Sequence, residues 1–283
     1  MPARAIVTAR QERLGAELRL LREQAGLTAR EAARNLSIDQ TKISHIEAGR
    51  VGVSDARVRR LAAHYACNDR DLVDALAAMA TERHRGWWES YRDTLPAGFL
   101  DLAELEHHAA FLQMAAIVHV PGLLQTPDYA RAVFSYALPE LSAPDLEARV
   151  EHRMQRKTVL RGAQPTDFVA IVHEAALRIM VADRPAARRQ LQAVIEASTA
   201  DNISVHVIPF TAEGFAGAGY SMLHAGGPTP RLDTIQLDRH GGNNYLYAEA
   251  QLNKYRQTFR KLMEAAIEPS DSRDFLHRLL KEL

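Results

Sequence analysis

The sequence of 283 residues contains a single cysteine and no long apolar run. Because Cys67 has no second cysteine to pair with, an intramolecular disulfide is excluded, which is typical of a reducing compartment. No stretch approaches the roughly 18 apolar residues that a membrane-spanning helix needs, and the first residues lack the apolar core of a secretory signal. We therefore expect a globular protein of the cytoplasm.

Sequence signatures of the common catalytic sites are also missing. There is no G-x-x-x-x-G-K, no G-x-G-x-x-G that opens a helix, and no H-E-x-x-H. His173, His206 and His224 fall on three predicted strands, so a metal site at one sheet edge is an alternative, but their spacing does not require it. Ser204 and Ser221 lack the context of a nucleophile. We expect no catalytic residue, no metal and no cofactor, and hence no enzyme.

The net charge is zero, but it is unevenly distributed along the chain. Residues 1–68 carry a formal charge of +5 and the remainder carries −5. This polarity is typical of a DNA-binding segment attached to a body that does not bind DNA. Because the positive excess is modest, we expect two copies to act together, as a homodimer on a paired half-site of double-stranded DNA.

Residues 12–66 contain consistent signals for a series of short helices. Leu14, Leu18 and Leu21 recur at i, i+4 and i+7, which predicts one apolar stripe on a first helix. Gly26 follows where a left-handed helix cap is needed. The same spacing predicts the core positions of the later helices, namely Ile43, Ile46, Val58, Leu61, Ala62, Tyr65, Leu72, Val73, Leu76 and Met79.

A helix, a turn and a second helix are predicted in the middle of this segment. Thr28 and Glu31 have the spacing of a capping box, so a helix starts there. Residues 37–39 form the turn, and Asp39 is the predicted N-cap of a helix over residues 40–48. Two further helices are expected to open at Ser54 and Asp69.

The outer face of the helix over residues 40–48 suits contact with DNA bases. Its candidate base-contacting residues are Gln40, Thr41, Lys42, Ser44 and His45. Gln can pair with adenine, and Lys can pair with guanine or a phosphate. The candidates for contacts to the DNA backbone are Thr28, Arg30, Arg34 and Arg50. The alternative is a solvated polar face in a small helical bundle, but the agreement of caps, turn and core stripe favours DNA recognition.

Three stretches, LGAELRLLREQAGLT, ISHIEAGR and LAAHYAC, resemble the xenobiotic-response-element type of phage-repressor-like DNA-binding domains. The resemblance implies that the helix over residues 40–48 enters the major groove. Two positions depart from the family pattern. Ala29 stands where a Gln often braces the recognition side chains, and Ser37 stands where a Gly usually starts the turn. A serine adopts the required backbone angle only at some cost.

The predicted organisation is multidomain. A helix-turn-helix DNA-binding domain of the all-α, phage-repressor-like class covers residues 1–81, a linker helix region covers residues 82–100, and an α+β or α/β domain covers residues 101–283. Trp87 and Tyr91 are four residues apart in the linker, where anchoring a helix is favoured over a ligand cage.

Helical and β-rich patterns alternate in the C-terminal domain. Helices are predicted over residues 101–115, 126–137, 144–161, 175–181, 186–198, 250–266 and 270–282. Strands are predicted over residues 117–120, 168–173, 203–208, 220–224, 233–237 and 245–247. We also expect a turn over residues 241–244 and an N-cap at Ser270.

The segment VPGLLQTPDYARAVF, together with HEAALR, RRQLQAVIE and ISVHVIPF, resembles a large actinobacterial regulator family in which a helix-turn-helix precedes a domain of unassigned function. One departure is Asp238, where the family tends to have Glu. The resemblance implies a cytoplasmic, nucleoid-associated transcriptional regulator. Members often lie beside the gene of a small partner protein, in an antitoxin-like arrangement.

The segment PGLLQT at residues 121–126 has two interpretations. Pro121 and a tight turn at Gly122 would direct the chain, Leu123 and Leu124 would anchor it, and Gln125 could cap a neighbouring backbone group. An architectural role is favoured over the rim of a ligand or partner groove. A glycine-rich loop over residues 215–220 is a second candidate rim.

Our leading hypothesis is a dimeric, autoregulating repressor whose C-terminal domain binds a partner protein or a small ligand. The alternative is an antitoxin-like protein that neutralises the product of an adjacent gene, with DNA binding secondary. An enzyme with an attached DNA-binding domain has the least support.

Overall fold

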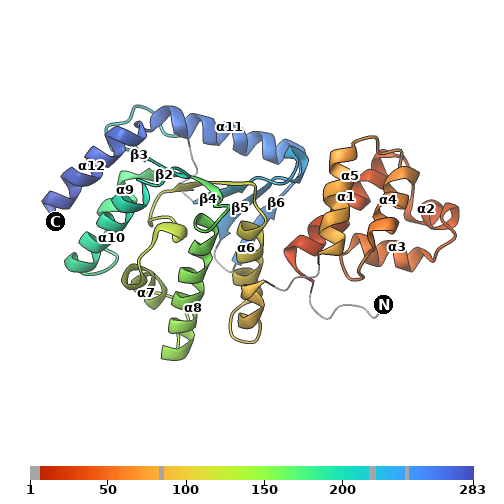
Figure 1. The fold of residues 1–283 in the computed structure, drawn as a ribbon, viewed down its shortest axis with the longest axis horizontal. Helices are drawn as coiled ribbons and strands as arrows, with labels where there is room; N and C mark the ends of the chain where they lie inside the picture. Colours follow the sequence, from red (N-terminus) through yellow and green to blue (C-terminus); the bar gives the residue numbers. More distant parts are fainter. Residues whose placement is uncertain (1–6, 83–85, 217–220, 240–241) are drawn as a thin grey trace. The chain divides into compact units, whose positions relative to one another are not determined.

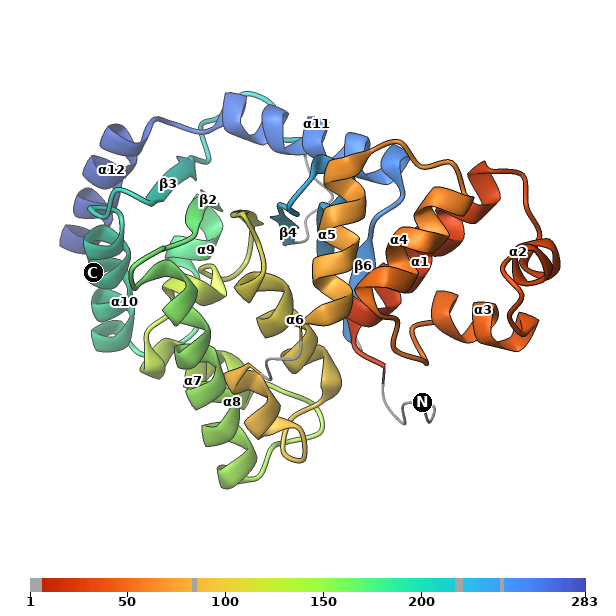
Figure 2. The same cartoon turned by 45° about the vertical axis from the view of Figure 1, so that its right-hand side comes forward.

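The computed structural model describes residues 7–82, 86–216, 221–239 and 242–283. The chain divides into two compact units, Met1–Trp87 and Trp88–Leu283 (Figures 1 and 2). The predicted linker region contains a short 3-10 helix, Trp87–Tyr91, and the first residues of a longer helix. In the described part of the chain, no helix is long and apolar enough to cross a membrane.

The N-terminal unit is helical, as predicted. Its helices are α1 (Ala9–Gln24), α2 (Ala29–Asn35), α3 (Gln40–Glu47), α4 (Asp55–His64) and α5 (Arg70–Thr81). The predicted apolar stripe of α1 is buried, as are Ile43 and Ile46 of α3. Among the predicted core positions, Val73 and Met79 are only half-buried.

Local capping determines where these helices begin and end. The capping box of Thr28 and Glu31 is formed, and Asp39 caps α3, as predicted. Gly26 has φ +69°, the left-handed cap that its position indicated. Ser37 has φ +54°, so the turn between α2 and α3 holds a non-glycine residue in the left-handed region.

The C-terminal unit is built on a six-stranded mixed sheet with the order β3-β2-β1-β4-β5-β6. The strands are β1 (Phe111–Ala116), β2 (Asp167–His173), β3 (Ile203–Ile208), β4 (Met222–Ala225), β5 (Thr234–Arg239) and β6 (Gly242–Leu246). β1, β2 and β3 are parallel, and β4, β5 and β6 continue the sheet with antiparallel pairing. The predicted α+β or α/β architecture is confirmed.

Helices cover both faces of this sheet. They are α6 (Ala97–His107), α7 (Pro127–Ser135), α8 (Ala143–Arg156), α9 (Glu174–Arg178), α10 (Arg184–Ala197), α11 (Glu249–Ala265) and α12 (Pro269–Glu282). Short 3-10 helices are η2 (Gly122–Leu124), η3 (Lys157–Leu160) and η4 (Pro230–Leu232). Figure 1 shows α11 on one side of the sheet and α7, α8 and α10 on the other.

The two faces are packed by alternate residues of the strands. On β2, Ala170 and Val172 face a core that includes residues of α10 and α12. Ile171, between them, faces a second core that includes Leu252 and Phe259 of α11. This alternation follows from the two-residue period of a strand, which allows one strand to be apolar on both faces.

Several predicted elements were placed wrongly. The predicted strand over residues 117–120 is a loop, and β1 lies earlier, with all but its last residue in the segment 101–115 that was predicted to be helical. Residues 242–244 belong to β6 instead of a turn. The last helix begins after Glu268 with Pro269 at its first turn, and Ser270 does not act as its cap. The predicted strand start at Tyr220 lies outside the described residues.

Candidate nucleic-acid interface and surfaces of the C-terminal unit

The outer face of α3 presents the predicted base-contacting side chains to solvent. Gln40, Thr41, Lys42 and Ser44 are exposed, and His45 is half-buried. Ser44 donates its hydroxyl proton to the carbonyl oxygen of Gln40 at 3.2 Å, so part of its capacity is used within the helix. The helix therefore offers a surface of short polar groups and one cation.

The N-terminus of α3 is fixed by its cap. Asp39 accepts a hydrogen bond from the backbone N–H of Thr41 at 2.6 Å. Hydrogen bonds from Thr41 lower the pKa of the Asp39 carboxyl, so this cap is charged at neutral pH. A capped first turn holds the adjacent polar side chains in defined positions.

The opposite end of α3 is fixed by a buried ion pair. Arg22 of α1 donates through Nε and Nη2 to the two carboxylate oxygens of Glu47, at 2.7 and 2.9 Å, and through Nη1 to the carbonyl oxygen of Leu27 at 2.7 Å. The Arg22 and Glu47 side chains are only 8% and 9% exposed. The hydrogen bond to Glu47 raises the pKa of Arg22, while burial opposes this shift.

α1 and α3 also approach closely at Gly15. A Cβ atom at this position would lie 2.8 Å from the carbonyl oxygen of Ile46, and it would lie closer still to that of Glu47. Only a residue without a side chain permits this contact. The rear of α3 is therefore held against α1 by both packing and charge.

The predicted contacts to the DNA backbone differ in availability. The Thr28 hydroxyl is already used, because it accepts from Glu31 N–H at 3.2 Å and donates to the Glu31 carboxylate at 2.7 Å. Three arginines are exposed and, among the described residues, have no side-chain hydrogen bond or ion pair, namely Arg30, Arg34 and Arg50. Sequence reasoning missed Arg60, an exposed arginine that donates to the carbonyl oxygen of Leu36 at 3.3 Å, beside the turn before α3.

The three histidines of the alternative metal site do not lie together. His173 caps α9 by accepting a hydrogen bond from Ala175 N–H at 3.1 Å. His206 interacts with Ser204 on its own strand at 2.8 Å. His224 lies 2.9 Å from the buried Asp233 carboxylate. Each histidine thus has separate local partners, and no metal-binding group of three His, Cys, Asp or Glu residues occurs where the chain is described.

The segment PGLLQT has the architectural contacts expected of it. Leu123 and Leu124 are buried, and the Gln125 amide donates to the carbonyl oxygen of Val120 at 2.7 Å, which confirms its predicted backbone-capping role. Gly122 is not in a left-handed conformation. A Cβ there would lie 3.4 Å from the side chain of Arg153.

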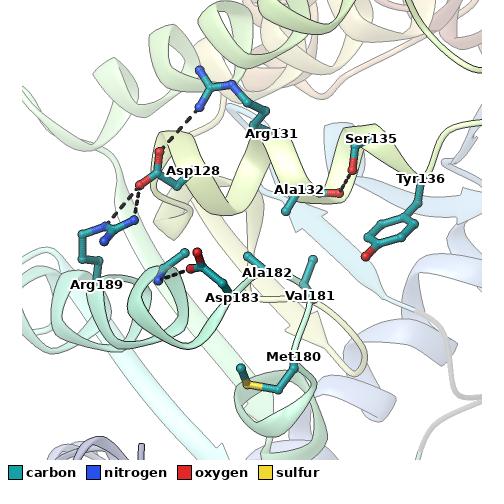
Figure 3. Close-up of a pocket in the computed structure, with 11 residues that line it drawn as sticks. Asp128, Arg131, Ala132, Ser135, Tyr136, Met180, Val181, Ala182, Asp183 and Arg189 are labelled. Atoms are coloured by element: carbon teal, nitrogen blue, oxygen red, sulfur yellow. Dashed lines mark hydrogen bonds and ion pairs between the residues drawn. The ribbon is translucent and has the colours of Figure 1, made fainter.

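A groove of about 580 Å³ lies beside α7 and the start of α10. Its lining combines Ala132, Tyr136, Met180 and Val181 with charged groups. Figure 3 shows Asp128 between Arg131 and Arg189, with the ring of Tyr136 at the other end of the groove. The Asp128 carboxylate accepts from Arg189 at 2.6 Å. The glycine-rich loop predicted as another rim lies mostly outside the described residues, which end at Ala216 and resume at Ser221.

The stability of the C-terminal unit is expected to depend on pH because of a buried histidine. His152 of α8 is 1% exposed, and burial, with Arg156 and Arg153, lowers its pKa to about 3. Because this pKa is below the unfolded value of about 6.5, the neutral form stabilises the fold fully above pH 6.5 and this contribution is lost as the pH falls towards 3. We expect about 2 kcal/mol of this loss between pH 7 and pH 5.

Replacing His152 with Phe should remove that part of the pH dependence. Urea unfolding followed by tryptophan fluorescence measures it, because Trp88 is buried in the same unit. The control is His277→Gln, because His277 is exposed and should leave the difference between pH 7 and pH 5 unchanged. An unchanged difference in His152→Phe would contradict the assignment.

Comparison with family models agrees with this division of the chain. Residues 13–76 match a helix-turn-helix domain. Residues 99–278, more than half of the chain, match a domain of unknown function, DUF5753. No curated protein and no solved structure matches the chain significantly. The chain therefore belongs to the DUF5753 family, and it combines that domain with an N-terminal helix-turn-helix domain.

Proposed function

We propose that the protein is a sequence-specific transcriptional regulator that inserts α3 into the major groove of DNA. The helix-turn-helix domain indicates DNA binding and regulation. The main support for this proposal is that the two sides of α3 differ. Its rear is fixed by Arg22, while Gln40, Thr41 and Lys42 stand exposed at its N-terminal end. A fixed helix with exposed polar groups is what direct readout of base edges requires.

The regulator is proposed to act as a homodimeric repressor of its own gene in the cytoplasm. A single N-terminal unit has a modest positive charge, so two units on adjacent half-sites would supply the specificity that one lacks. We assign dimerisation to the C-terminal unit. We propose that this unit also binds a partner protein or a small ligand and that it catalyses no reaction.

Exposed apolar side chains near the groove support an interaction surface on this unit. Tyr136 is 73% exposed and Met180 is 49% exposed, and both line the groove. Leu138 and Ile179, which are close to them in the sequence, are 89% and 42% exposed. Clusters of exposed apolar residues commonly mark protein interaction sites. The same surface supports the alternative, an antitoxin-like protein that neutralises a small partner protein.

Two tests with the protein encoded by an adjacent gene separate these two functions. A regulator that senses its partner should change its DNA affinity when the product of the adjacent gene is added. An antitoxin-like neutraliser should instead abolish the partner's own effect on cells even when α3 can no longer bind DNA.

Substitution of Gln40 tests the proposed reading of DNA. Gln40→Ala should weaken binding to a selected site by about 1–3 kcal/mol because a base contact is lost, and should hardly change binding to random DNA. Fluorescence anisotropy at one stated salt concentration measures both affinities. The control is Arg50→Ala, which should weaken both alike. Equal losses on both DNAs for Gln40→Ala would show that α3 is not the reading element.

A further inference from the structure

A basic stripe runs along α8 and into η3. Arg149, Arg153 and Lys157 are spaced at i, i+4 and i+8, so they lie on the same side of the helix. Their neighbour Arg156 is already paired, because it donates to both carboxylate oxygens of Glu106 at 2.7 and 2.6 Å. Within the described ranges, no carboxylate lies at ion-pair distance from any of the three residues of the stripe.

The guanidinium of Arg153 is held in position without a carboxylate at ion-pair distance among the described residues. It lies 4.5 Å from the centre of the Phe134 ring, and its Nη1 donates to the side-chain oxygen of Gln125 at 2.5 Å. Its Nε is buried and has no acceptor among the described residues. Lys157 donates to the backbone oxygen of Gln125 at 3.0 Å, so two cations converge on this one residue of the PGLLQT segment.

Arg149 repeats this arrangement one turn earlier. Its guanidinium lies 5.2 Å from the centre of the Phe99 ring, and its Nε is likewise buried without an acceptor in the described part of the chain. Aromatic rings and amide oxygens stabilise a cation only partly. Both arginines are half-buried, and a partly desolvated cation without a full counter-charge is costly, so a bound anion would supply the missing charge.

The surrounding groups leave an excess of positive charge. Burial and Arg156 lower the pKa of Arg153 to about 9, so it stays charged at neutral pH. Burial also lowers the pKa of His119, with Arg153 as a further cause, so this histidine is neutral there. Glu106 and Asp238 partly offset this by raising the pKa of Arg153, but Glu106 is paired with Arg156 and Asp238 is exposed at the end of β5.

We propose that Arg149, Arg153 and Lys157 bind the oxyanion group of a small molecule, either a carboxylate or a phosphate, and that Gln125 positions Arg153 and Lys157. The planar guanidinium of Arg153 supplies directed donors for such a group, and Lys157 supplies a point charge. The use of this ligand as a signal rests on the proposed regulator function. Binding of the ligand itself requires no DNA and can be tested separately.

Calorimetric titration of the full chain with inorganic phosphate, and separately with acetate, tests the site at constant ionic strength. Wild-type protein should bind at least one of the two. Arg153→Met should weaken that binding by about tenfold or more, since a charge-assisted hydrogen bond is lost. Binding of phosphate alone would indicate a phosphorylated ligand, and binding of acetate alone would indicate a carboxylic acid.

Two control variants locate the anion. Arg260→Met changes an exposed arginine of α11, and Arg92→Met changes an arginine already paired with Glu89, both in the C-terminal unit. Both should bind the anion as wild type does. Absence of binding by wild type, or binding by Arg153→Met as strong as that of wild type, would overturn the proposal. Lys157→Met provides a second variant of the site, and thermal unfolding without added anion verifies that each variant is folded.

Discussion

Replacing Glu47 with Ala is expected to destabilise the helix-turn-helix unit by about 3 kcal/mol, the lower end of the cost of breaking a buried ion pair. Glu47 holds both Nε and Nη2 of Arg22, and both side chains are almost fully buried. Its removal leaves the buried Arg22 guanidinium with only the carbonyl oxygen of Leu27 and, at 3.6 Å, the half-exposed carboxylate of Glu23. Urea unfolding of the full chain, followed by far-ultraviolet circular dichroism, measures the loss in the transition of this unit.

The matched control for Glu47 is Glu23→Ala. Glu23 also faces arginines, Arg19 at 2.7 Å and Arg22 at 3.6 Å, but its side chain is 47% exposed. Exposed pairs contribute about 0–1 kcal/mol, so this variant should be close to wild type. Similar losses in Glu47→Ala and Glu23→Ala would contradict a special role for the buried pair. Removing both partners, with Arg22→Met and Glu47→Leu, should recover most of the stability because no unpaired charge remains.

Gly15→Ala is expected to destabilise the same unit by about 1–3 kcal/mol, the usual range for an overpacked contact. The added Cβ would overlap the backbone of α3 at Ile46 and Glu47, so one helix must move. Ala in place of Gly inside a helix ordinarily stabilises the helix by roughly 0.5–1 kcal/mol. A loss of stability in Gly15→Ala would therefore show that the overlap with α3 outweighs this gain.

DNA affinity gives the second readout for Gly15. A shift of α3 should weaken specific binding of Gly15→Ala even at temperatures where the protein is fully folded. The control is Leu20→Ala on the same helix, since Leu20 is 40% exposed and should affect neither property much. A stabilised Gly15→Ala with normal DNA binding would show that the two helices are less tightly packed than described.

Local chemistry made the N-terminal unit predictable. Thr28 with Glu31, Asp39 and Gly26 each mark a helix end by a side chain or a backbone angle that few other residues supply. The apolar stripe of α1 then indicates which face is buried. All of these signals act over three or four residues, and they agree with one another, so the helices follow from the sequence.

β1 was missed because its sequence does not resemble a strand. Residues 111–116 read FLQMAA, which are poor in β-branched side chains, whereas residues 117–120 read IVHV and form a loop. The strand is stabilised by its neighbours, since Leu112 pairs with Phe168 on one side and with Ala225 on the other. Pairing with distant segments overrides local preference in a central strand.

The buried contacts that hold the candidate sites in place could not be predicted from the sequence for the same reason. Glu47 is 25 residues from Arg22, and Arg153 is 28 residues from Gln125. No spacing rule connects residues so far apart. The exposed residues of α3 followed from helical periodicity, but the buried contacts that position them required the fold.

Footprinting on a site selected from random DNA sequences, with guanine N7 methylation to probe the major groove, shows whether α3 reads DNA. We expect two protected half-sites about one helical turn apart, with loss of major-groove protection in Gln40→Ala and retention of it in Arg153→Met. Failure to select any sequence, or protection confined to the minor groove and unchanged in Gln40→Ala, would contradict the assignment of α3 as the DNA-reading helix.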